Sequence, residues 1–277
     1  MNSSLIIAGA PRSGTSALTH YLSQLPEYNT DYKLKDFPII SMPETLAKKD
    51  IRSAETVILS RYKKINLFSD VNIIYHSKSI ENIRKYFGSK FYILVMLRNP
   101  VDRIVSELIY NQNRRVDRDD FAFSLKKSFE SRHLYNKHGQ NYFFYSLYNK
   151  HLDNLRNSLK NDENLITLNY EEFFNKKIQS NFKKLLNIIN VKYTKSIDFK
   201  KINMSSEKIN SEFLSKLLFD PKFLISTKSL IKKVVPIKVR RQIIHSIWSL
   251  RSSSENSNDK SYREKIKSHI LDNYNIF

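Results

Sequence analysis

The chain has 277 residues, of which 40% are hydrophobic and 27% are charged, a composition typical of a globular protein with one sizeable core. It contains no cysteine, which excludes disulfide bonds, thiolate catalysis and cysteine-ligated zinc. Its 47 lysine and arginine residues outnumber its 27 acidic residues, which gives a formal charge of +20. This charge should attract anions such as nucleic acid, an anionic membrane, an acidic glycan or a charged nucleotide, but it does not indicate which of them is the partner.

The chain opens with a short apolar run, Leu-Ile-Ile-Ala at residues 5–8, which suits a buried parallel strand. Apolar residues then recur at helical spacing from Leu18 to Leu25, so we expect a strand, a tight loop and a helix. The run is too short for a signal sequence or a membrane span, and no other stretch approaches a membrane helix. We therefore expect a cytoplasmic protein with no integral membrane segment.

Residues 9–16, Gly-Ala-Pro-Arg-Ser-Gly-Thr-Ser, keep the glycine spacing of a nucleotide P-loop but have Thr15 in place of its lysine. The backbone N–H groups of such a loop can still bind a phosphate, and Arg12 adds a cation that can neutralise charge on a leaving oxygen without a metal. The loop lacks the P-loop lysine, and no acidic residue is clearly placed at a strand end to hold magnesium. Both observations disfavour a kinase or NTPase. The alternative is that this stretch is only a turn.

The same arrangement recurs twice. Residues 91–97 form a second apolar run, after which Asn99 can cap a helix that begins at Pro100. A strand candidate at 165–168 precedes apolar residues at helical spacing over 182–189. Strands that alternate with helices predict an α/β fold, with a parallel sheet covered on both sides.

The rest of the chain is expected to be mainly helical. Residues 124–159 predict helices with aromatic faces, and 252–259 predict a polar loop before a final helix. We expect a single domain over 1–277, with a mostly helical C-terminal subregion from about residue 205.

Two motifs together resemble the sulfotransferases that use 3'-phosphoadenosine-5'-phosphosulfate (PAPS), closest in pattern to bacterial and carbohydrate-type members. They are residues 11–16, Pro-Arg-Ser-Gly-Thr-Ser, and 98–106, Arg-Asn-Pro-Val-Asp-Arg-Ile-Val-Ser. Looser similarity covers most of the chain and includes Asn-Tyr-Glu-Glu-Phe at 169–173. The resemblance implies a P-loop NTPase-like sheet flanked by helices, PAPS as the donor and no metal. The alternative for Arg98 is a surface ion pair with Asp102.

The resemblance also implies roles for individual residues. The 5'-phosphosulfate would be held by Arg12, Ser13, Gly14, Thr15 and Ser16. The 3'-phosphate would be held by Arg98 and Ser106, and Lys201 falls where relatives cover the cofactor. Asp36 is the candidate base that takes the acceptor's proton, because carbohydrate-type relatives have an acidic residue soon after the first helix. The alternatives that stay open for the base are Asp31, Glu44, His20 and His76, and Asp70 is a candidate to support the base without touching the acceptor.

A basic stretch at residues 228–241 has lysines and arginines among apolar residues. It could make peripheral contact with an anionic membrane or bind a polyanion, or it is a helix pair broken at Pro236 whose lysines face water. We expect transfer to a hydroxyl or amine, with a glycan favoured and lipids, small alcohols and peptide tyrosines left open. A small-molecule kinase and a non-enzymatic polyanion-binding protein are the rival functions; no nucleic-acid-binding motif is found.

Overall fold

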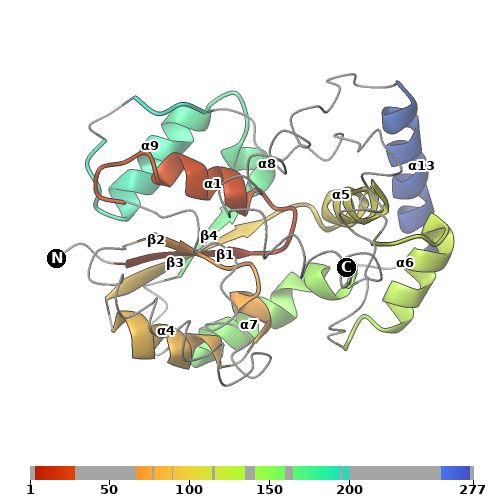
Figure 1. Ribbon diagram of the computed structural model, residues 1–277, viewed down its shortest axis with the longest axis horizontal. Helices are drawn as coiled ribbons and strands as arrows, with labels where there is room; N and C mark the ends of the chain where they lie inside the picture. Colours follow the sequence, from red (N-terminus) through yellow and green to blue (C-terminus); the bar gives the residue numbers. More distant parts are fainter. Residues whose placement is uncertain are drawn as a thin grey trace, which may run out of the picture. The chain divides into compact units, whose positions relative to one another are not determined.

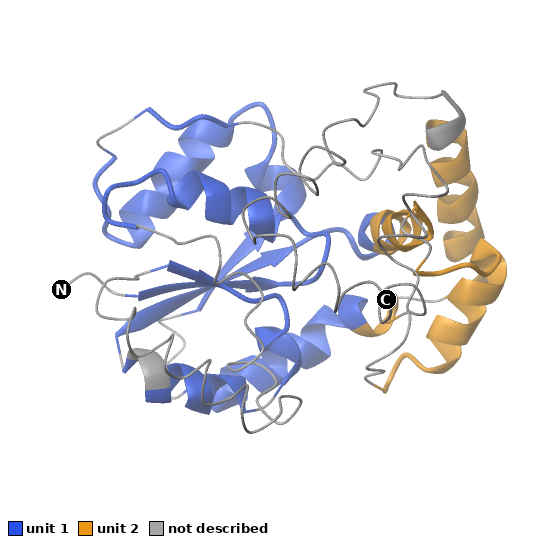
Figure 2. Cartoon of the chain, viewed as in Figure 1, with its two compact units in different colours: residues 1–103, 145–203 blue, residues 104–144, 204–277 orange. Residues whose placement is uncertain are grey.

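The computed structural model, drawn in Figure 1, describes residues 4–28, 67–76, 78–88, 90–113, 116–134, 141–159, 165–193, 196–199 and 257–274. Contacts divide the chain into two compact units, coloured separately in Figure 2. The first comprises residues 1–103 and 145–203, and the second comprises 104–144 and 204–277. The expectation of a single domain stays a prediction.

The first unit is built on a four-stranded parallel sheet with the strand order β2-β1-β3-β4. Its strands are β1 (Ser4–Gly9), β2 (Leu67–Ser69), β3 (Phe91–Leu97) and β4 (Leu165–Asn169). Three of them confirm the predicted strands, whereas the three-residue β2 was not predicted. Because all four run the same way, the loops that follow them lie along one edge of the sheet.

Helices cover both faces of this sheet, as the α/β prediction requires. Leu5 and Ile7 of β1 belong to one buried cluster, to which α1 (Thr15–Leu22) and α9 (Ile178–Ile188) contribute. Ile6 and Ala8 belong to a second cluster, which includes residues of α4 (Ser79–Phe87) and α7 (Tyr148–Ser158). Successive strand residues point to opposite faces, so the clusters lie on opposite sides of the sheet, as Figure 1 shows.

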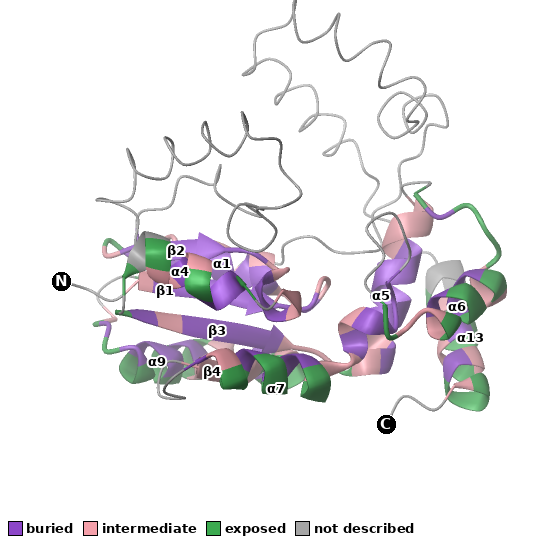
Figure 3. Ribbon diagram, turned by 90° about the horizontal axis from the view of Figure 1, so that it is seen from below, coloured by how far each residue is buried: buried purple, intermediate pink, exposed green. Residues whose placement is uncertain are grey.

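Burial follows the same pattern. In Figure 3, β1 and β3 are mostly buried, whereas α4, α7 and α9 expose their outer faces. Three short elements complete the first unit near the strand ends: η4 (Ile73–Tyr75) follows β2, α8 (Tyr170–Phe173) follows β4, and the last residues of η5 (Phe144–Ser146) precede α7. These short elements place polar side chains close to the carboxyl edge of the sheet.

Helix α5 (Pro100–Asn113) begins as its sequence predicts. The Asn99 side-chain oxygen accepts hydrogen bonds from the backbone N–H groups of Val101 (3.0 Å) and Asp102 (3.2 Å). These two N–H groups have no partner within the helix, so Asn99 is the N-cap. The helix starts in the first unit and continues into the second.

The second unit contains α6 (Phe121–Glu130), which Asp120 caps, and α13 (Ser257–Asn273). Aromatic side chains join these helices, and the rings of Phe121 and His269 lie 5.4 Å apart, edge to face. The expected loop over 252–259 is wrong in its last three residues, which are helical. Serine, asparagine and aspartate favour helix N-termini as strongly as loops, which explains the error.

Candidate anion-binding site

The loop between β1 and α1 depends on glycine at its first position. Gly9 has φ +132°, and a Cβ atom there would overlap the backbone carbonyl of Met96 on β3. Only glycine allows this close approach between the two strand ends. The loop of 9–16 is therefore fixed directly beside the end of β3.

Gly14 is fixed in the same way at the other end of the loop. It has φ +83° and is the N-cap of α1, and a Cβ atom there would lie 2.6 Å from Phe174 and 2.8 Å from Tyr170. The first turn of an α-helix carries the positive end of the helix dipole, so an anion seated in the loop would lie beside that end of α1.

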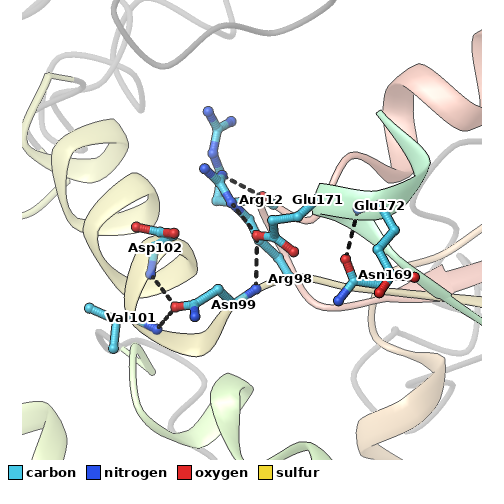
Figure 4. Close-up of polar contacts among 8 residues, drawn as sticks. All are labelled: Arg12, Arg98, Asn99, Val101, Asp102, Asn169, Glu171 and Glu172. Atoms are coloured by element: carbon cyan, nitrogen blue, oxygen red, sulfur yellow. Dashed lines mark hydrogen bonds and ion pairs between the residues drawn. The ribbon is translucent and has the colours of Figure 1, made fainter. Parts of the chain in front are cut away.

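Arg98 follows β3 and reaches across to this loop. Its Nη1 donates a hydrogen bond to the backbone carbonyl of Arg12, with an N···O distance of 3.1 Å (Figure 4). Its guanidinium carbon lies 4.7 Å from the centre of the Tyr170 ring. Two interactions from different strand ends therefore orient the guanidinium.

The turn after β4 supports Arg98 through Glu171 as well. Glu171 Oε1 accepts a hydrogen bond from the backbone N–H of Asn99 (3.0 Å) and lies 3.9 Å from Arg98 Nε (Figure 4). Asn169 caps the short α8 by accepting from the N–H of Glu172 (3.0 Å). Tyr170 and Glu171 thus gain a positioning role that the sequence resemblance alone did not assign.

Donor groups at this edge of the sheet are left for a ligand. Ser13 is fully buried, and its Oγ has no hydrogen-bond partner among the described residues. The same holds for Arg98 Nε, on a side chain that is 19% exposed. Because buried polar groups are normally hydrogen-bonded, two donors without a hydrogen bond beside a P-loop-like turn fit a bound phosphate or sulfate, although Arg98 Nε also faces Glu171 in an ion pair.

A family model, the sulfotransferase domain, matches residues 2–216. The chain belongs to the sulfotransferase family. A sulfotransferase from Alicyclobacillus acidocaldarius has a similar fold, with a TM-score of 0.58 and 19% identity over 84% of this chain and 96% of that one. Mouse sulfotransferase SULT7A1, complexed with PAP, shows 21% identity over 70% of this chain and 61% of that one, with a TM-score of 0.47. No curated protein sequence matches the chain.

The sulfotransferase fold confirms the expected P-loop-like α/β architecture. The structure brings together residues 12–16 and Arg98, which the sequence placed in two separate motifs. Ser106 is buried in α5 and belongs to the second unit, so its phosphate role stays a prediction. Asp31, Asp36, Glu44, Lys201 and the basic stretch of 228–241 lie outside the described residues.

The remaining residues predicted to take the proton, or to support the residue that does, are placed as follows. Asp70 directly follows β2 and is fully buried; its N–H donates to the Ile7 carbonyl (3.0 Å), and its Oδ1 accepts from the Asn72 N–H (2.9 Å). An acidic residue therefore does lie at the end of a strand next to β1. Its position at a strand end was not predicted from the sequence because β2 was not predicted. His76 follows η4, and His20 lies on α1 with its ring 6.0 Å from that of Tyr21.

In the part of the chain that the structure describes, no three histidine, aspartate or glutamate side chains gather as metal ligands. None of the helices in this part is both long enough and apolar enough to cross a bilayer. The cytoplasmic location expected from the sequence stays a prediction.

Proposed function

We propose that the chain transfers a sulfuryl group from PAPS to a hydroxyl or amine acceptor, with a glycan as the favoured acceptor class. The observation that carries this proposal is the hydrogen bond from Arg98 to the Arg12 carbonyl. It means that the loop after β1 and the arginine after β3 adjoin at neighbouring strand ends. PAPS carries anionic groups at both the 5' and the 3' position of its adenosine, so a protein that binds it needs two anion-binding groups close together.

The chemistry that PAPS supplies is a transferable sulfuryl group: the bond from sulfur to the 5'-phosphate oxygen breaks as the acceptor oxygen or nitrogen bonds to sulfur. The chain then has to hold both anionic ends, stabilise charge on the departing phosphate oxygen and accept one proton from the acceptor. The Arg12 guanidinium is suited to the second task because it stands inside the phosphate loop.

The residues fall into four groups by proposed role. The 5'-phosphosulfate is held by Arg12, Ser13, Gly14, Thr15 and Ser16. The 3'-phosphate is held by Arg98 and Ser106, and Lys201 covers the donor. Asp36 takes the proton, and Asp70, which is buried beside β1, is the alternative that we add from the described residues.

A glycan acceptor is favoured because the two motifs resemble those of carbohydrate-type enzymes and because a chain with a charge of +20 attracts acidic sugars. The basic stretch of 228–241 would add to this attraction, or to peripheral contact with an anionic membrane.

Transfer of label distinguishes this function from its rivals. The purified chain is incubated with radiolabelled PAPS and a panel of acidic glycans, neutral glycans, lipids, small alcohols and tyrosine peptides, and in parallel with γ-labelled ATP and magnesium. Asp70 at the end of β2 is the observation that justifies the ATP arm. Sulfate transfer from PAPS that needs a higher PAPS concentration in the Arg98→Ala variant supports the proposal; phosphate transfer from ATP, or binding of glycan without transfer from PAPS, contradicts it.

A further inference from the structure

Tyr148, the first residue of α7, has a buried hydroxyl that the packing of its ring does not require. Its ring packs against the second core cluster, together with Leu97 at the end of β3. Its hydroxyl oxygen is buried and has no hydrogen-bond partner among the described residues. A phenylalanine would fill the same space without burying an unpaired donor, so packing does not explain the tyrosine.

The surroundings of that hydroxyl belong to the anion site. It lies near the side chain of Ser13 and the backbone of Arg98, although neither approach has the geometry of a hydrogen bond. Ser13 Oγ is likewise buried and has no hydrogen-bond partner among the described residues. Two unpaired hydroxyls, one from the phosphate loop and one from α7, therefore lie close together.

The Tyr148 hydroxyl remains protonated and can serve only as a neutral donor or acceptor. Burial raises its pKa, and the opposing influences of the Arg103 charge, the Ser13 hydroxyl and the Arg98 backbone are smaller. Ser13 Oγ can accept one hydrogen bond while it donates its own proton elsewhere. An anion in the loop would be the acceptor for the hydrogen bond that the Ser13 hydroxyl donates.

We propose that Tyr148 is a positioning residue for the donor: its hydroxyl donates to Ser13 Oγ when an anion occupies the loop, and so directs the Ser13 proton at that anion. This inference rests on the proposed function, because the anion is taken to be the 5'-phosphate of the PAPS product, 3'-phosphoadenosine-5'-phosphate (PAP). No bond to Tyr148 is needed before the ligand arrives. The role is therefore one of binding, distinct from support of the fold.

A double-mutant cycle read by calorimetric titration with PAP tests the inference. Tyr148→Phe should weaken PAP binding by about three- to tenfold, and in a Ser13→Ala background the same change should cost less than about twofold. Tyr193→Phe is the matched control, since Tyr193 packs with the cluster on the opposite face of the sheet, and it should leave PAP binding unchanged.

Thermal unfolding separates positioning from a structural role. Without ligand, the unfolding midpoint of Tyr148→Phe should lie within about 2 °C of that of the unmodified protein, or above it. Addition of PAP should raise the midpoint of Tyr148→Phe by less than it raises that of the unmodified protein. A clear loss of stability without ligand, equal PAP affinity in the two proteins, or an undiminished effect in the Ser13→Ala background would overturn the inference and leave the proposed function standing. Failure of the unmodified chain to bind PAP would overturn both.

Discussion

The Arg98 guanidinium donates to the backbone carbonyl of Arg12, so the side chain that follows one strand is tied to the phosphate loop that follows its neighbour. This contact makes the two motifs one site. It also means that a change at Arg98 acts on the loop as well as on any phosphate that Arg98 itself holds.

Replacing Arg98 should mainly weaken donor binding. Arg98→Ala removes a charge-assisted donor together with its contact to Arg12, and we expect PAP affinity to fall by about tenfold or more. Arg98→Lys keeps the charge but not the planar fork, and it should recover only part of the loss. Titration calorimetry measures both, and full recovery by lysine would show that charge alone suffices.

Arg12 should instead affect turnover. Its side chain is assigned to charge that develops only as the sulfuryl group departs, so Arg12→Ala should lower kcat by about a hundredfold or more while PAP binding changes much less. Arg12→Lys should retain more of the rate. Single-turnover rates combined with calorimetry give the two numbers, and a loss confined to binding would exchange the roles of Arg12 and Arg98.

Gly14 offers a matched pair of glycine substitutions. Both Gly14 and Gly88 have positive φ, +83° and +73°, but a Cβ atom at Gly14 would clash with Tyr170 and Phe174, whereas one at Gly88 meets nothing within 4 Å. Gly88→Ala should cost only backbone strain, about 1–3 kcal/mol, because φ +73° with ψ −152° is a conformation that almost only glycine adopts. Gly14→Ala should cost more and should also weaken PAP binding, because Arg98 stacks on Tyr170. Equal stability losses in urea unfolding would show that the loop tolerates the side chain.

Two carboxylates compete for the role of base. Asp36→Asn should leave PAP affinity unchanged and lower kcat by at least about a hundredfold, because the acceptor's proton then has no carboxylate to receive it. Asp70→Asn is the comparison variant. If Asp36→Asn keeps full activity and Asp70→Asn loses it, Asp70 is the base; if both stay active, neither residue is.

Alkaline pH should destabilise the first unit through its buried tyrosines. Burial, with a smaller contribution from Glu27, raises the pKa of Tyr28 to about 12 from 10.0. The folded state therefore keeps a proton that the unfolded state releases: this stability is fully present below pH 10 and is lost as the pH rises from 10 to about 12, by up to about 1.4 kcal/mol per pH unit. In Tyr28→Phe, the free energy of unfolding measured with urea should decline less steeply between about pH 9 and about pH 11. The same slope against pH in both proteins would contradict this prediction.

The sequence was sufficient for the parts of the fold in which local pattern and turn chemistry agree. The runs at 91–97 and 165–168 are mostly apolar and are followed by residues that can cap a helix, so both strands were predicted. The three residues of β2 are too few to show a period, and with them the position of Asp70 was missed.

The assembly of the site could not be predicted in the same way. The order β2-β1-β3-β4 decides that Arg98 meets the loop after β1, and nothing local to either motif specifies that order. The approach of Tyr148 to Ser13 likewise depends on how α7 packs against the sheet. Contacts between residues far apart in the chain are set by tertiary packing, which a motif does not record.

The most direct test compares PAP with adenosine 5'-monophosphate, which lacks the 3'-phosphate, by calorimetric titration into the same protein. If two adjoining anion sites hold the two ends of the donor, PAP should bind at least about tenfold more tightly, and Arg98→Ala should remove most of that difference. Equal affinities for the two nucleotides, or a preference for PAP that survives Arg98→Ala, would contradict the account.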